Sequence, residues 1–253
     1  MNKSKLSRFQ CALLGIEITP IDKSQLLTEI SHGIALARTT IIVGHNLHSS
    51  YIFHTNSQFQ AFYSDASIIL TDGMPVLWDY HLSGGKNNSR LGSTDWLPDL
   101  RRVENLKSVL VIGSTPEANQ GFQEWLTSIL PHARVAGMPG SGWNQGKEEE
   151  AVALVRDFRP DLTLIGLGMP LQEEFGARLL LQAPELKALA LVGGAIDQLS
   201  GAQSNAPRAI GKLGLEWCWR LATQPRRLAG RYLLEPWKLL GVRIRTLLSR
   251  KSS

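Results

Sequence analysis

Short runs of apolar residues alternate between residues 12 and 192 with stretches whose apolar residues recur every three or four positions. The short, continuous runs predict strands, and the helical spacing between them predicts amphipathic helices. This alternation is typical of parallel βαβ units, in which helices cover both faces of the sheet. The predicted strands span residues 12–18, 40–43, 68–70, 108–112, 134–137, 162–165 and 188–192.

Polar residues that favour helix starts precede several of the helical stretches. Asp22 can cap a helix that reaches about residue 37, and Thr115 can cap one in which Pro116 takes the first position. Further helices are predicted over residues 49–64, 74–82, 116–130, 148–158 and 172–181. We therefore expect an α/β fold with a parallel sheet and helices on both of its faces.

From about residue 206 the pattern changes, and no further strand is predicted. Aromatic residues and many leucines are mixed with arginines, and Pro225 and Pro236 are expected to divide the segment into short helices. We expect residues 1–205 to form the α/β core and residues 206–253 to form a basic, amphipathic helical appendage.

Charge divides the chain at nearly the same place. The net charge of +5 is the sum of two opposite charges. Residues 1–207 hold 16 basic and 20 acidic residues, a charge of −4, and residues 208–253 hold 11 basic and two acidic residues, a charge of +9. The body is therefore mildly acidic, which argues against a protein whose whole surface coats nucleic acid. With 43% hydrophobic and 19% charged residues in 253, the chain has ample material for a globular core.

The basic appendage allows three interpretations. Arginine mixed with aromatic residues suits a nucleic-acid surface, and the same mixture on an amphipathic helix suits an anionic membrane. A helical hairpin packed on the core with a charged outer face is the third. Because the core lacks a matching basic cluster, the membrane is favoured over nucleic acid. No signal peptide or apolar run of membrane-spanning length is visible, so we expect a cytoplasmic protein.

Glycine-rich loops follow five of the predicted strands, where open parallel sheets bind ligands. The loop that begins at Gly113 suits a phosphate at a helix N-terminus, although an ordinary strand-to-helix turn is the commoner meaning. Asp72 follows a strand directly and can serve as a general base or as a turn residue that caps the next helix. Asn46 can bind a ligand or tie a turn.

Several kinds of site are not supported by the sequence. No Walker motif, no complete GxGxxG fingerprint and no Asp-x-Asp pair occurs. His45 and His48 have no Cys, Asp or Glu at a matching spacing, so we expect no metal site and no bound cofactor. Cys11 and Cys218 are too few for a disulfide scaffold.

Taken together, six blocks resemble the WecG/TagA/CpsF glycosyltransferases, glycosyltransferase family 26, in order and spacing over nearly the whole chain. The blocks are Leu70-Thr71-Asp72-Gly73-Met74-Pro75-Val76, Arg90-Leu91-Gly92-Ser93-Thr94-Asp95, Val111-Ile112-Gly113-Ser114, Gly166-Leu167-Gly168-Met169-Pro170-Leu171-Gln172-Glu173, Gly193-Gly194-Ala195-Ile196-Asp197, and Gly214 to Leu221 followed by Gln224-Pro225-Arg226-Arg227.

The resemblance implies a Rossmann-like core and an inverting, metal-independent enzyme of bacterial cell-surface polysaccharide synthesis. Such an enzyme moves N-acetylmannosamine, its uronic acid or glucose from a UDP-sugar donor to a polyprenyl-diphosphate-linked saccharide. It implies a peripheral protein on the inner face of the plasma membrane, with the appendage contacting an anionic membrane surface and closing the site. No nucleic acid is expected as a partner, and homo-oligomerisation stays open.

The resemblance also implies roles for individual residues. Asp72 matches the catalytic base, which would take the proton of the acceptor hydroxyl. The implied substrate-binding residues are Asn46, Thr71, Arg90, Asp95, Gly113, Gly168, Gln172, Gly194 and Asp197. Arginines of the appendage are implied to neutralise the diphosphate of UDP or of the lipid carrier, namely Arg220, Arg226, Arg227 and Arg231.

The chain departs from the family pattern at three positions that flank the predicted sugar site. Gly44 stands where many relatives have Thr, Leu47 where Pro is frequent, and Leu171 where Lys is common. The departures leave the donor sugar open. Two other functions remain as alternatives: a nucleotide-binding membrane-surface adaptor without transferase activity, and a Rossmann-type oxidoreductase.

Overall fold

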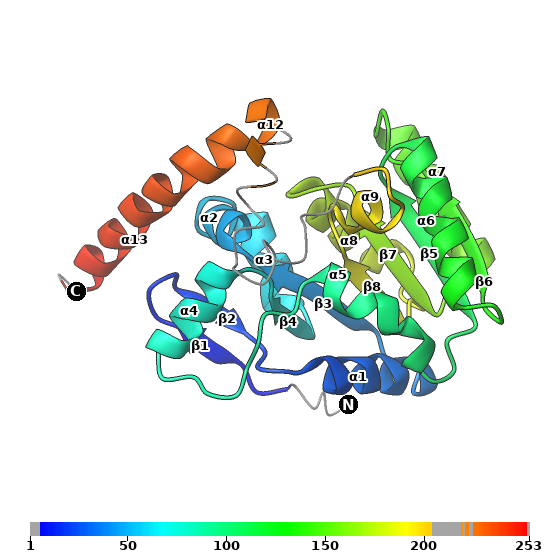
Figure 1. Cartoon of the computed structure of the whole chain (residues 1–253), viewed down its shortest axis with the longest axis horizontal. Coiled ribbons are helices and arrows are strands. Elements are labelled where there is room, and N and C mark those ends of the chain that lie inside the picture. Colours follow the sequence, from blue (N-terminus) through cyan, green and yellow to red (C-terminus); the bar gives the residue numbers. More distant parts are fainter. Residues whose placement is uncertain (1–5, 204–218, 220, 223–224, 252–253) are drawn as a thin grey trace.

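A six-stranded parallel sheet forms the centre of the molecule in the computed structural model, which describes residues 6–203, 219, 221–222 and 225–251 (Figure 1). The strands lie in the order β4-β3-β8-β7-β5-β6, and every adjacent pair is parallel. The fold is therefore Rossmann-like, as expected. In this order the strands are β4 (Ile68–Thr71), β3 (Thr40–His45), β8 (Ala188–Leu191), β7 (Leu162–Gly166), β5 (Ser108–Gly113) and β6 (Arg134–Met138).

Helices cover both faces of the sheet and bury two separate apolar layers. One layer is formed with α1 (Lys23–Ala35), α5 (Ser93–Trp96), η1 (Leu97–Arg102), α6 (Pro116–Ile129) and α9 (Ala195–Leu199). The other is formed with α2 (Leu47–Thr55), α3 (Ser57–Asp65), α7 (Gln145–Phe158) and α8 (Leu171–Gln182). The helices that follow β3 and β8 therefore leave the sheet on opposite faces, which opens a crevice between these neighbouring strand ends.

Helix caps act where the sequence predicts them. The Asp22 side chain accepts a hydrogen bond from the backbone N–H of Gln25, and Thr115 accepts one from Ala118. Both contacts satisfy backbone donors that the first turn of a helix leaves unpaired. The prediction was wrong for residues 49–64, because Asn56 interrupts them in an extended conformation and caps the second helix, α3.

The predicted strand over residues 12–18 is also wrong. The segment forms part of a hairpin between β1 (Phe9–Cys11) and β2 (Ile16–Ile18), which pair antiparallel. Gly15 adopts a φ of 65°, a left-handed conformation that glycine tolerates readily, and so the chain reverses. The hairpin packs its apolar side on α4 (Met74–Leu82), and the backbone N–H of Thr19, just after β2, donates to the Ile69 carbonyl of β4 at 2.8 Å.

Residues 225–251 form one continuous run of helix. α12 (Pro225–Ala229), the π-helical turn η2 (Gly230–Leu234) and α13 (Glu235–Lys251) follow one another without a break. Pro236 was predicted to divide this segment, and it does not. The wide turn before it accommodates a residue that lacks an N–H and would crowd a regular helix. The predicted boundary between residues 205 and 206 lies outside the described residues.

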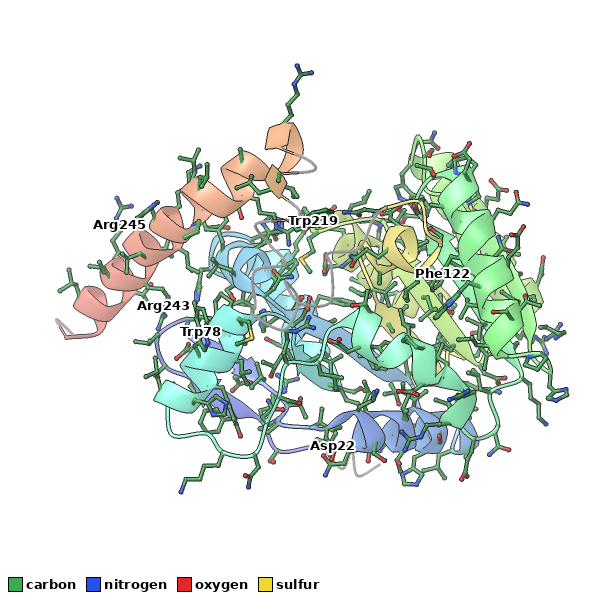
Figure 2. The ribbon with its side chains drawn as sticks, in the orientation of Figure 1. Asp22, Trp78, Phe122, Trp219, Arg243 and Arg245 are labelled. Carbon is green, nitrogen blue, oxygen red and sulfur yellow. The ribbon has the colours of Figure 1, made fainter. Side chains whose placement is uncertain are left out.

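α13 lies along α2 and the β1–β2 hairpin (Figure 1). Leu239 is buried on its inner side, and Arg243, also buried, donates to the carbonyl oxygens of Leu13 and Ala12 at 2.9 Å each. In Figure 2, Arg243 points from α13 toward the core, whereas Arg245 lies on the other side of the helix. Among the described helices none is long and apolar enough to span a bilayer.

Candidate active site

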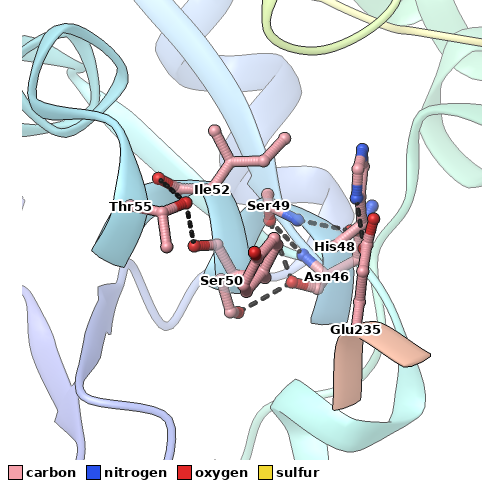
Figure 3. Close-up of polar contacts among 8 residues, drawn as sticks. Asn46, His48, Ser49, Ser50, Ile52, Thr55 and Glu235 are labelled. Carbon is pink, nitrogen blue, oxygen red and sulfur yellow. Dashed lines mark hydrogen bonds and ion pairs between the residues drawn. The ribbon is translucent and has the colours of Figure 1, made fainter. Parts of the chain in front are cut away.

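Asn46 and Asp72 lie side by side at the carboxyl edge of the sheet. β3 and β4 are parallel neighbours with His45 opposite Thr71, so the next residue of each strand reaches the same point. Nδ2 of Asn46 donates to Oδ2 of Asp72 at 3.4 Å. The other end of the Asn46 amide caps α2, because its Oδ1 accepts from the Ser49 N–H at 3.0 Å (Figure 3). The cap fixes the amide that holds the half-buried Asp72 carboxylate.

The segment around Gly92 packs against the Asp72 carboxylate on another side. The Leu91 N–H donates to the Thr71 carbonyl at 2.8 Å, which ties this segment to the end of β4. Asp95 binds the Gly92 N–H through Oδ2 at 2.8 Å and the Arg90 guanidinium through Oδ1 at 3.1 Å. A Cβ atom at position 92 would stand 2.6 Å from Oδ1 of Asp72. Glycine is therefore required for the carboxylate to occupy its position.

Glycines at the ends of β5, β7 and β8 pack against one another. A Cβ atom at Gly113 would meet the carbonyl group of Gly166, and one at Gly166 would stand 2.7 Å from the Gly193 carbonyl oxygen. Ser114, the residue after β5, donates its hydroxyl hydrogen bond to Asp197 at the start of α9. Main-chain atoms and Asp197 therefore occupy the middle of the carboxyl edge.

A cavity of about 580 Å³ lies between these strand ends and the C-terminal helices. Its volume falls within the range of small-molecule sites. Arg231 and Lys238 contribute positive charge to its wall, and Asp197 and Glu235 contribute negative charge. The described lining residues are His48, Gly166, Leu167, Gly168, Met169, Gly193, Gly194, Asp197, Leu228, Gly230, Arg231, Leu234, Glu235 and Lys238.

His48 and Glu235 connect the core to the C-terminal helices across this cavity. Nδ1 of His48 lies 2.6 Å from Oε2 of Glu235, and both side chains are largely buried (Figure 3). Burial lowers the pKa of His48, the positive charge of Arg231 lowers it further, and the bond to Glu235 opposes both. Asn46 and His48 share the first turn of α2, so the same turn holds Asp72 and contacts α13.

A buried polar layer lies beneath the loops. Gln172 and Glu173 are almost fully buried at the start of α8, and Nε2 of Gln172 donates to Oε1 of Glu173 at 3.0 Å. Burial raises the pKa of Glu173 to about 8, and burial together with the charge of Glu173 raises that of Tyr63. Tyr63 in turn donates to the Gly44 carbonyl at 2.9 Å. Through this bond the buried layer contacts the end of β3.

His45, the last residue of β3, belongs to the same layer. Its ring is fully buried 4.4 Å from the Tyr63 ring, measured between centroids, and its Nδ1 lies 3.0 Å from the Ser49 hydroxyl. Burial lowers its pKa to about 3, so the imidazole is neutral at physiological pH. Among the described residues no group of three or more His, Cys, Asp or Glu side chains could hold a metal ion.

The structure divides the predicted site residues into groups. It brings Asn46, Thr71, Asp72, Arg90 and Asp95 together beside the ends of β3 and β4. Gly168, Gly194, Asp197 and Arg231 line the cavity, Gly113 packs beneath it, and Gln172 lies in the buried layer. Arg226 is exposed, and both Arg220 and the Arg227 side chain lie outside the described residues.

Sequence reasoning missed His48, Glu235 and Lys238 as residues of the cavity wall. The only local signal was the Asn46-Leu47-His48 departure from the family pattern. Glu235 could not be paired with His48 from the sequence, because 187 positions separate them.

An open parallel sheet with glycine loops and a carboxylate at its carboxyl edge defines a Rossmann-like ligand-binding protein. The chain belongs to the glycosyl transferase WecG/TagA/CpsF family, whose model matches residues 11–253. The residues of the candidate site fall within this match.

Curated relatives give the family match a more specific direction. The chain is 30% identical over 166 residues to an N-acetylglucosaminyldiphosphoundecaprenol N-acetyl-β-D-mannosaminyltransferase of Bacillus subtilis strain 168, covering 65% of this chain and 64% of that protein. An enzyme of the same name from Staphylococcus aureus strain MRSA252 is 26% identical, covering 69% and 68%. One from Bacillus spizizenii is 29% identical, covering 68% and 66%. The match thus spans just under two thirds of the Bacillus subtilis enzyme.

Proposed function

We propose that this protein is an inverting glycosyltransferase that moves a hexose-type sugar from a UDP-sugar to a polyprenyl-diphosphate-linked saccharide. N-acetylmannosamine is the first candidate sugar, because the relatives are named for its transfer. The observation that carries the proposal is the placement of Asp72. Its carboxylate stands at the carboxyl edge of the sheet, held by Asn46, next to the helix turn that leads into the cavity.

Asp72 would act as the general base. Its carboxylate would take the proton of the acceptor hydroxyl while the hydroxyl oxygen forms a bond to the anomeric carbon. The bond between that carbon and the β-phosphate oxygen of UDP would break, and UDP would leave with the electron pair. Attack from the face opposite the leaving group inverts the anomeric configuration. Asn46 and the segment around Gly92 would keep the carboxylate in line with the acceptor.

The leaving diphosphate needs positive charge, and the cavity wall supplies it. Arg231 and Lys238 stand on the helical side, opposite the glycine loops on the sheet side. Charged donors fixed before the reaction stabilise a developing anion without reorganisation. We propose that these side chains stabilise the diphosphate in a metal-independent reaction. Activity that persists in excess EDTA would support this, and activity restored only by a divalent cation would contradict it.

The decisive experiment pairs a donor screen with a single substitution. The wild-type protein is incubated with UDP-N-acetylmannosamine, UDP-N-acetylmannosaminuronic acid or UDP-glucose and an N-acetylglucosamine-diphosphate-prenyl acceptor, and UDP and disaccharide are both measured. Asp72→Asn should lower turnover by roughly a hundredfold or more, the upper part of the range for general-base effects. Asp65→Asn, an exposed aspartate of α3, is the matched control.

The alternatives give different results in that experiment. UDP binding without any disaccharide would favour an adaptor without transferase activity. Binding of NAD in place of UDP would favour an oxidoreductase. Near-wild-type turnover of Asp72→Asn would remove the aspartate from the role of base.

We also propose that residues 206–253 form an appendage that holds the protein on the inner face of the plasma membrane. Support comes from the outer side of α13, where Trp237, Leu240, Ile244 and Leu248 recur at helical spacing and are 48–73% exposed. We call these four residues the α13 outer face. Arg245 is exposed on the same helix and suits anionic headgroups.

A further inference from the structure

A second hollow lies next to the cavity, and its chemistry is different. It is a groove of about 340 Å³ between the β1–β2 hairpin, the start of α2 and α13. Its described lining is entirely apolar: Leu13, Leu14, Leu47, Pro236, Trp237, Leu239 and Leu240. We call it the hairpin groove. Several of these side chains are exposed, and a groove of this composition would gain stability from an apolar occupant.

Neighbouring residues of the same two helices line the two hollows. In α2, Leu47 lines the hairpin groove and His48 lines the cavity. In α13, Trp237 lines the groove and Lys238 lines the cavity. The His48–Glu235 pair, 2.6 Å apart, therefore marks the boundary between an apolar hollow and a charged one.

An occupant of both hollows must have a charged part joined directly to an apolar part. The acceptor of the proposed reaction has this form, since a diphosphate is bonded to a chain of isoprene units. We infer that the hairpin groove binds the first isoprene units of the acceptor, and that the acceptor diphosphate lies where this groove meets the charged cavity. This inference rests on the proposed function for the identity of the occupant. It assigns the prenyl chain a protein site of its own before it reaches the membrane.

The position of the groove fits the direction that such a substrate must take. Leu47 directly follows Asn46, so the groove begins one residue from the amide that holds Asp72. At its other end the groove reaches Trp237 and Leu240, which also belong to the α13 outer face. A prenyl chain that leaves the diphosphate through this groove would emerge at the surface that we propose to contact the membrane.

The test distinguishes the contribution of the hairpin groove from that of the α13 outer face. Leu13 lines the groove but lies outside the α13 outer face, and its side chain is 61% exposed, so Leu13→Ser should fold. Its N–H bond to Asp79 and its carbonyl bond to Arg243 involve backbone atoms and persist in the variant. Ile244→Ser changes the outer face without changing a groove residue. Leu36→Ser, an exposed leucine at the end of α1, is the distant control.

Binding is measured first by titration calorimetry, with farnesyl diphosphate and dimethylallyl diphosphate as soluble probes that share a diphosphate and differ by two isoprene units. The wild type should bind the longer probe more tightly by at least about tenfold, given the value of buried methylene groups. Leu13→Ser should reduce this ratio by roughly threefold or more, and Leu36→Ser should leave it unchanged. Equal binding of the two probes by the wild type would overturn the inference.

Transfer is then measured with two N-acetylglucosamine-diphosphate acceptors, one with three isoprene units and one with a single unit. The chain-length preference is the ratio of their kcat/KM values. A chain-length preference that Leu13→Ser reduces supports the groove. A preference that Ile244→Ser reduces equally would assign the effect to the outer face and overturn the inference. Probe binding that depends on chain length and on Leu13, without transfer to either acceptor, would leave the groove standing and refute the proposed function instead.

Discussion

Arg243 and Leu13 are joined across 230 positions by one hydrogen bond, from the guanidinium Nε to the carbonyl oxygen, 2.9 Å long. The same guanidinium binds the Ala12 carbonyl, and it lies against Gly15, where any Cβ atom would collide with it. The hairpin thus provides two carbonyl acceptors for the arginine, and the missing side chain of Gly15 leaves space for the guanidinium. This contact, with the His48–Glu235 pair, fixes α13 to the core.

Arg243→Ala should loosen α13 while the sheet keeps its stability. The substitution removes two hydrogen bonds from a charged donor, each worth about 1.5–3 kcal/mol. We expect amide hydrogens of α13 to exchange at least about tenfold faster, while those of β3 and β7 keep their protection. Hydrogen exchange followed by mass spectrometry measures both regions in one sample.

Arg245→Ala is the matched control, because Arg245 is exposed on the other side of the helix (Figure 2). Gly15→Ala should reproduce the effect of Arg243→Ala from the hairpin side, since its φ of 65° and the guanidinium both oppose a side chain. Unchanged exchange in α13 for both variants would mean that other contacts fix the helix.

Gly92→Ala should impair turnover more than folding. Gly92 has a φ of −90°, which alanine adopts without strain, so the cost arises from the Cβ atom 2.6 Å from Oδ1 of Asp72. Displacing a catalytic group by a fraction of an ångström to one ångström lowers turnover by about tenfold to a hundredfold. Steady-state kinetics and the melting temperature are compared with those of Gly241→Ala, where a Cβ atom meets nothing within 4 Å. A kcat equal to that of the wild type would show that the carboxylate can move aside freely.

Glu173 should make the protein less stable as the pH rises. Its pKa is raised from 4.5 to about 8, so between these values the folded chain retains a proton that the unfolded chain releases. The free energy of unfolding therefore falls with increasing pH in this window, by up to about 1.4 kcal/mol per pH unit. Glu173→Gln keeps the shape without a titrating proton and should flatten the profile, as measured by urea denaturation from pH 5 to pH 8.

Glu174→Gln, on the next residue, is the control for the altered charge of α8. A profile of Glu173→Gln as steep as that of the wild type would place the pH dependence elsewhere. His45 affects stability at acidic pH, because its pKa in the folded chain is lowered to about 3 and the buried imidazole must stay neutral. Its contribution is lost as the pH falls from 6.5 toward 3.

The α13 outer face should govern binding to membranes. An Ile244→Ser, Leu248→Ser double variant removes two exposed apolar side chains and leaves the contacts of Arg243 in place. Its partition onto vesicles with anionic lipid should fall by roughly tenfold, as expected for loss of two buried apolar side chains. Co-sedimentation with vesicles measures this, with Leu36→Ser as the control. Equal sedimentation of the double variant and the wild type would exclude the face from membrane contact.

Local patterns predicted the elements of the sheet well, because each buried strand is a short apolar run and its neighbours begin at recognisable caps. The closeness of Asn46 and Asp72 follows from the same reasoning, as both come directly after strands that turn out to be adjacent and parallel. Such residues can be found without a structure.

Other features depend on contacts that local sequence does not encode. The hairpin was read as a single strand because its two short strands form one apolar segment and only Gly15 marks the reversal. The pairs His48–Glu235 and Arg243–Leu13 join opposite ends of the chain. The burial of Glu173 also escapes local analysis, since a glutamate in the first turn of a helix normally faces solvent.

The packed glycines at the ends of β5, β7 and β8 limit which side of the cavity can change during evolution. A Cβ atom at Gly113 would collide with the Gly166 carbonyl group, and one at Gly166 would collide with the Gly193 carbonyl oxygen. Gly193 has a φ of 52°, a left-handed conformation that favours glycine, so Gly166 and Gly193 contribute peptide groups alone to the sheet side of the cavity. A side chain at Gly113 or Gly166 would push apart the neighbouring strand ends. Changes to the shape and charge of the cavity can therefore arise more readily on the helical side, through residues such as His48, Leu234 and Lys238, than on the sheet side.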